Sequence, residues 1–105
     1  MVNVTIVYTK KSLSELTIKG HANSGEYGKD LVCAAVSAIA IGSLNALDGE
    51  GENFEIEVGE GYVHLKAKAP ISEHDQTVLE TMIIQLKTIE LSPQTKGTIA
   101  IKERK

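Results

Sequence analysis

Along this chain, two segments in which apolar residues alternate are followed by an apolar segment of helical length, and this order occurs twice. Residues 2–8 alternate between apolar and polar or smaller side chains, and residues 16–18 resume the alternation after a polar turn at residues 9–12. A two-residue period is typical of half-buried strands, so these segments predict a β-hairpin. The apolar segment that follows, residues 31–47, has the length of a helix and ends at Asp48-Gly49. We therefore expect a hairpin followed by a helix.

The second half of the sequence repeats this order. Residues 54–58 and 63–67 alternate around a glycine-rich turn at residues 59–61, which predicts a second hairpin. Residues 72–89 begin with a capping-box-like sequence and continue with helical spacing, and residues 99–101 alternate again. The order β-β-α-β-β-α-β predicts an α+β fold, a two-layer sandwich in which two helices cover one face of a mainly antiparallel five-stranded sheet.

The composition is that of an ordinary globular protein. With 105 residues, 42% of them hydrophobic and 24% charged, residues 1–105 are expected to form a single domain with one core. The single cysteine excludes an internal disulfide bond. Aromatic residues make up 4% of the chain and Trp is absent, which argues against a base-stacking surface. Direct nucleic-acid binding is therefore not expected.

Two further observations concern location and burial. The first residues lack the charged and apolar regions of a signal peptide, so we expect a cytoplasmic protein. Residues 31–47 are interrupted by polar residues and are fewer than the roughly 20 that a membrane span needs, so no membrane segment is expected. The helix predicted there is apolar nearly all round, which requires either deep burial or a partner subunit over its outer face.

Charged residues gather in two places, although the formal net charge is only -3. An acidic run precedes and includes the second hairpin: Asp48, Glu50, Glu52, Glu55, Glu57 and Glu60. It is either a solvated hairpin surface or a face that attracts a basic partner. The basic residues at the other end, Lys102, Arg104 and Lys105, are expected to form a frayed tail.

The chemistry of the chain centres on its one cysteine, Cys33. Asp30 is a good N-cap, and a cap there places Cys33 in the first turn of the helix, where unpaired N–H groups favour a negative charge such as a thiolate. The thiolate is the nucleophilic form of cysteine. His21, at the end of the second strand, is the expected proton acceptor, and the segment between them, including Gly25 and Gly28, is expected to be irregular. The alternative is that Cys33 is a small buried hydrophobe.

Several residues near Cys33 are further candidates for the site, and most of them have two interpretations. Ser37 lies on the same helical face as the cysteine and either donates to the thiolate or bonds to its own backbone. Asp30 caps the helix or orients the imidazole, and Tyr27 is a candidate to line a substrate pocket. Gly25 and Gly28 are hinges of a lid or ordinary turn residues with positive φ.

The remaining histidines, His64 and His74, have no ligand spacing to each other or to Cys33. No metal site and no cofactor are therefore expected.

The segment around the cysteine resembles the signature of the bacterial ribosomal-processing cysteine proteases. The matching residues are Gly-His-Ala at 20–22, Gly28, and Asp-Leu-Val-Cys-Ala-Ala-Val-Ser at 30–37. The resemblance implies a homodimeric cytoplasmic endopeptidase that removes a short N-terminal extension from a protein of the large ribosomal subunit, cutting after an aromatic residue.

The same resemblance assigns residues to roles. It implies that His21 and Cys33 are the catalytic pair and that Asp30 and Ser37 occupy supporting positions. Residues 22–29 correspond to a mobile segment that shapes the substrate channel, which makes Gly20, Gly25, Tyr27 and Gly28 candidates for supporting or substrate-binding roles. Two other functions stay open: a non-catalytic ribosome-associated protein that holds a peptide in the same groove, and a dimeric structural module with an inert cysteine.

Overall fold

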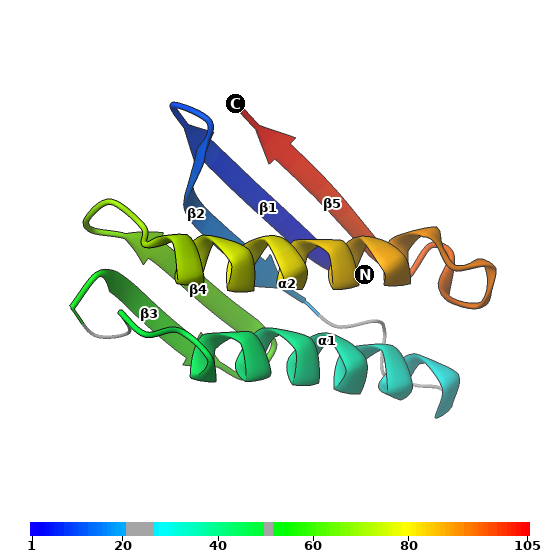
Figure 1. Cartoon of the computed structure of the whole chain (residues 1–105). Coiled ribbons are helices and arrows are strands. Elements are labelled where there is room, and N and C mark those ends of the chain that lie inside the picture. Colours follow the sequence, from blue (N-terminus) through cyan, green and yellow to red (C-terminus); the bar gives the residue numbers. More distant parts are fainter. Residues whose placement is uncertain (21–26, 50–51) are drawn as a thin grey trace.

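The computed structural model describes residues 1–20, 27–49 and 52–105, and of residues 27–30 only the backbone (Figure 1). Its elements follow the predicted order: β1 (Val2–Thr9), β2 (Ser12–Lys19), α1 (Tyr27–Asn45), β3 (Phe54–Gly59), β4 (Tyr62–Ala67), α2 (Glu73–Leu91), the short 3-10 helix η1 (Pro93–Thr95) and β5 (Ile99–Arg104). Both predicted hairpins, both helices and the last strand are confirmed.

The five strands form one sheet in the order β3-β4-β2-β1-β5. The β1–β2, β2–β4 and β3–β4 pairs are antiparallel, and β5 joins β1 in parallel. The predicted mainly antiparallel α+β sheet is therefore confirmed. The expectation of a frayed basic tail is wrong, because β5 pairs with β1 as far as Arg104 opposite Val7.

Both helices cover the same face of the sheet and run in opposite directions (Figure 1). The alternating apolar residues of the strands point to this face, so that Ile6 and Leu65, for example, are fully buried. Val36 and Ala40 of α1 and Leu86 of α2 are buried against them. These residues belong to one continuous hydrophobic core that connects the sheet with both helices.

The N-terminus of α1 differs from the prediction in one respect that affects the site. The helix begins at Tyr27, so Asp30 has helical backbone and is not its N-cap, and Gly28 is not part of an irregular segment. Cys33 consequently lies in the second turn, beyond the first four N–H groups that lack intrahelical partners. An acidic residue is favoured both at the N-cap and inside the first turn, so the sequence did not distinguish the two positions.

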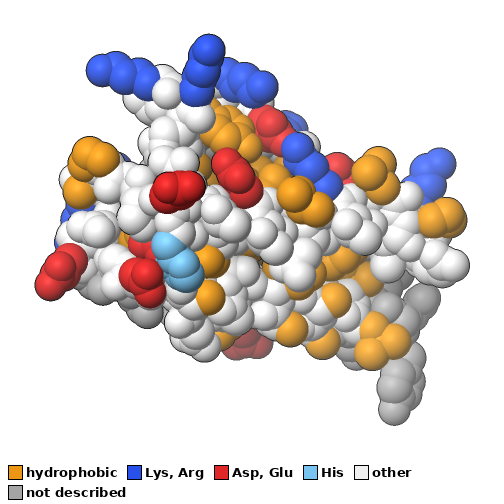
Figure 2. Space-filling view, in the orientation of Figure 1, with side chains coloured by type: hydrophobic (Ala, Val, Ile, Leu, Met, Phe, Trp, Pro, Cys, Tyr) orange, Lys and Arg blue, Asp and Glu red, His pale blue; other side chains and the backbone are white. Residues whose placement is uncertain are grey.

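The outer face of α1 is not deeply buried. Leu31 is 68% exposed, and Ala34, Ala38 and Gly42 are also exposed, whereas Val36 and Ala40 face the core. Hydrophobic side chains are exposed at several places on the helical face of the molecule (Figure 2). Within the described part of the chain, no helix combines the length and apolar character of a membrane span.

Candidate active site

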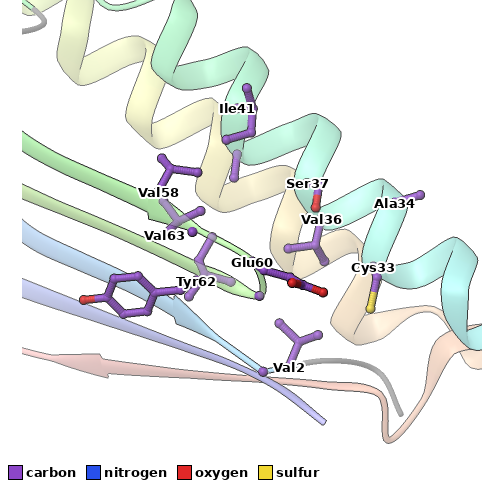
Figure 3. A pocket seen from close by; sticks show the side chains of 15 residues that line it. Val2, Cys33, Ala34, Val36, Ser37, Ile41, Val58, Glu60, Tyr62 and Val63 are labelled. Atoms are coloured by element: carbon purple, nitrogen blue, oxygen red, sulfur yellow. The ribbon is translucent and has the colours of Figure 1, made fainter. Parts of the chain in front are cut away.

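A cavity of about 340 Å³ lies between the middle of α1 and the turn that joins β3 to β4 (Figure 3). Its walls come from residues 58–63 of the hairpin, from Val2, Ile18 and Gly20 at the ends of the central strands, and from six residues of α1: Cys33, Ala34, Val36, Ser37, Ala40 and Ile41. Most of these side chains are apolar. We call this cavity the groove.

Cys33 forms part of the groove wall. It is partly exposed and packs against the core with its remaining surface. Figure 3 shows its sulfur on the side of α1 that faces Val2 and the groove. Ser37, one turn further along the helix, also lines the groove, as its predicted place on the same helical face requires. Cys33 is therefore not a fully enclosed core residue, and a ligand in the groove can reach it.

Gly20 brings the end of β2 to the same groove. Its φ is +99°, and a Cβ at this position would stand 2.5 Å from the carbonyl oxygen of Met1, so only glycine fits without displacement. Its N–H donates to the carbonyl of Gly61 at 2.9 Å. The end of β2 and Cys33 thus lie along one groove, as expected if the helix packs back on the sheet.

Several predicted site residues lie outside the described structure. His21 and Gly25 are not among the described residues, so their distance from the cysteine stays a prediction. Tyr27, Gly28 and Asp30 lie in the first turn of α1, and only their backbone is described.

Glu60 is a groove residue that the sequence did not identify. It stands on the turn between β3 and β4 and lines the groove opposite α1 (Figure 3). The acidic run was recognised from the sequence, but nothing local to the run separates Glu60 from the other acids. The pairing of β4 with β2, which brings this turn beside Gly20, is a tertiary arrangement.

A second cluster of polar side chains joins the end of α1 to the start of α2. One oxygen each of Asp48 and Asp75 and a ring nitrogen of His74 lie within 4.8 Å of one another. Asp75 is 1% exposed, and its two oxygens accept the N–H groups of Asp48 at 2.8 Å and Gly49 at 3.1 Å. His74 Nε2 is 3.0 Å from the carbonyl oxygen of Ala46. Because the Asp75 carboxylate and the His74 ring already bond to the backbone, the cluster is a structural joint between the helices.

The contacts in this joint change the pKa of His74. The hydrogen bond to the Ala46 carbonyl and the nearby Asp48 carboxylate raise the pKa of His74 above its ordinary value, because both stabilise the protonated ring. A protonated histidine beside the carbonyl end of α1 is also favoured by the helix dipole.

Comparison with known proteins places this chain in a class of enzyme. The family described as cysteine protease Prp matches residues 1–96. The ribosomal processing cysteine protease Prp of Staphylococcus aureus (strain Mu50) is 35% identical over 94 residues, which cover 86% of this chain and 89% of that protein. The protein of the same name from Bacillus subtilis is 34% identical over 87 residues, covering 76% and 78%.

Solved structures agree with these matches. The crystal structure of the ribosomal processing protease Prp from S. aureus with a covalently linked product peptide has a TM-score of 0.84 and 31% identity, covering 99% of this chain and all (100%) of that one. The structure with a substrate peptide has a TM-score of 0.79 and 29% identity, over the same shares of the two chains (99% and 100%). The fold is thus that of a cysteine protease family. The chain belongs to the Prp family, the ribosomal processing cysteine proteases that the Gly-His-Ala and Asp-x-x-Cys residues resemble.

Proposed function

We propose that this protein is an endopeptidase that removes a short N-terminal extension from a protein of the large ribosomal subunit, with Cys33 as nucleophile and His21 as general base. The observation that carries the proposal is the position of Cys33 in the wall of an open, mainly apolar groove. Family membership supports it, as do the peptides in the two S. aureus structures.

The chemistry assigned to the pair is that of a thiol protease. His21 takes the proton from Cys33, and the thiolate attacks the scissile carbonyl carbon. The imidazolium then protonates the leaving amine as the peptide bond breaks. Water hydrolyses the resulting thioester and restores the thiol. Attack on the carbonyl carbon leaves a negative charge on the carbonyl oxygen, which N–H donors can stabilise. Because Cys33 lies beyond the first turn of α1, its own N–H is not one of the unpaired donors of the helix N-terminus, and we do not assign it this role.

The groove suits an extended peptide with one large apolar side chain. Its volume of about 340 Å³ lies in the range of ligand sites, and Val36, Ile41 and Val58 supply apolar walls. This supports cleavage after an aromatic residue. Gly20, at the end of the groove, and Ser37, beside Cys33, are assigned supporting roles.

The other residues of the signature receive roles by resemblance alone. Asp30 is assigned to support the catalytic pair. Gly25, Tyr27 and Gly28 are assigned to the segment that binds substrate.

The proposal also covers the domain organisation of the protein, its oligomeric state and its location. Residues 1–105 act as one cysteine protease domain, since both helices and all five strands share one core. The protein is a homodimer, and the exposed Leu31, Ile84 and Leu91, which are 68%, 64% and 79% exposed, offer apolar surface for a second copy. It acts in the cytoplasm, where ribosomal proteins are made.

The test is incubation with a large-subunit ribosomal protein that carries its N-terminal extension, with the products identified by mass. The wild-type protein should release the extension, and Cys33→Ala should release none while keeping the fold. Ala38→Ser, an exposed change on the same helix outside the groove, is the matched control and should cleave normally. Full activity in purified Cys33→Ala overturns the proposal.

The alternative function, a non-catalytic protein that binds a peptide in the groove, predicts a different result in the same incubation. A non-catalytic binding protein would retain the extended ribosomal protein without cutting it, and replacement of Cys33 would leave that binding unchanged. Alkylation of the thiol adds a second readout, because a catalytic cysteine reacts at a lower pH than a free thiol.

A further inference from the structure

Glu60 differs from every other described residue that lines the groove, because it alone carries a charged side chain. The α1 wall contributes Cys33, Ser37 and apolar residues. In Figure 3 the Glu60 side chain extends from the β3–β4 turn into the space between that turn and α1. A peptide in the groove therefore passes one carboxylate.

The turn that carries Glu60 is held in place on both sides. The β3–β4 pairing continues up to Gly59 opposite Tyr62, so only Glu60 and Gly61 make the turn. Gly61 has φ +64°, and its carbonyl accepts the N–H of Gly20 at 2.9 Å. Because these hydrogen bonds hold the backbone of the turn, a contact to Glu60 requires ordering of its side chain but little ordering of the backbone.

The charge of Glu60 is not neutralised by its described surroundings. The ion pairs among the described residues involve His64, His74 and Lys87, and none includes Glu60. Glu57, three residues earlier on β3, is exposed and adds to the negative potential of the hairpin. None of the described residues that line the groove is a cation, so a cationic side chain of a bound peptide would complement Glu60.

We propose that Glu60 is a specificity residue that selects peptides with a lysine or arginine side chain near the scissile bond, through an ion pair at the mouth of the groove. This inference rests on the proposed function, since it concerns the substrate of the same site. Glu60 is exposed, so the pair is screened by water and salt. Replacing it with a neutral residue should lower kcat/KM for the cationic peptide by about two- to fivefold at low salt.

The test uses one cleavable extension in which single positions on either side of the scissile bond carry Lys, Gln or Glu in turn. The wild-type protein should prefer Lys over Glu at one position, and the preference should fall as salt is raised. Glu60→Gln should lower cleavage of the Lys peptide more than that of the Gln peptide and so remove most of this preference, and Glu60→Lys should reverse it. Glu55→Gln, an exposed acid of the same hairpin that does not line the groove, should behave as wild type.

The outcomes separate the two proposals. The role of Glu60 is overturned if wild type and Glu60→Lys prefer the Lys peptide over the Glu peptide equally, or if wild type shows no preference at any position. Either result leaves the proposed protease function standing. Equal loss on Lys, Gln and Glu peptides in Glu60→Gln overturns the role of Glu60 as well, because the residue then acts on every substrate alike. A wild-type protein that cleaves none of the peptides overturns the proposed function, and this inference with it.

Discussion

Replacement of Asp75 by asparagine should destabilise the fold more than any change of similar size on the surface of α2. The carboxylate is 1% exposed and accepts two backbone N–H groups, from Asp48 and Gly49, so it ties the segment that follows α1 to the start of α2. Asparagine keeps the shape but puts an NH₂ group against one of these donors. The loss of a charge-assisted bond, together with a buried N–H left unpaired, should cost about 3 kcal/mol.

This cost converts to a measurable shift in Tm. An unfolding entropy of roughly 2.1 cal/mol/K per residue gives about 4–5 °C per kcal/mol for a chain of 105 residues. Asp75→Asn should therefore lower Tm by about 13 °C, as followed by circular dichroism, and urea unfolding should give the same change in free energy. Glu80→Gln, an exposed change on the same helix, should shift the free energy by less than about 0.5 kcal/mol. A loss below about 1 kcal/mol for Asp75→Asn would show that the joint does not hold the helices together.

Three further changes test other parts of the structure. Because the pKa of His74 is raised in the folded protein, its protonated ring stabilises the fold fully at pH values below the pKa of the unfolded state, and this contribution is lost as pH rises through the pKa of the folded state. His74→Gln should therefore lower the free energy of unfolding more at pH 5.5 than at pH 8.5. An equal loss at both pH values would refute the assignment. Gly20→Ala should destabilise by roughly 1–2 kcal/mol and impair peptide cleavage, because the methyl group meets the carbonyl of residue 1; unchanged unfolding and activity would contradict this. Lys10 and Lys11 have φ of 53° and 67° in the β1–β2 turn, so Lys11→Gly should stabilise by about 1 kcal/mol in urea, whereas destabilisation would exclude backbone strain there.

The strands and helices were predictable because their signals are local. Alternation fixes which face of a strand is buried, and the residues that alternate in β1 and β4, such as Val4 and Leu65, are buried as expected. The start of α2 also follows from its sequence, since the Ser72 side chain accepts the N–H of Asp75 at 3.1 Å. The capping pattern did not reveal that the carboxylate of Asp75 bonds to Asp48, beyond the end of α1, because that contact spans 27 residues.

The candidate site was predictable in part. The Gly-His-Ala and Asp-x-x-Cys residues identified the family and placed Cys33 on a helix near the end of β2. The start of α1 was misplaced, because an aspartate fits both the N-cap and the first turn. Glu60 was missed, since its place in the groove depends on the order of strands in the sheet, which alternation alone does not determine.

The central claim is that Cys33 is the nucleophile of a peptide-cleaving site. Its most direct test is the intact mass of the protein after reaction with a peptide of the ribosomal extension that carries an electrophile in place of the scissile carbonyl. Wild type should gain one peptide adduct, mapped to Cys33, and lose cleavage activity in proportion, whereas Cys33→Ala should gain none. Inactivation by the peptide without an adduct on Cys33, or an equal adduct on Cys33→Ala, would contradict the account.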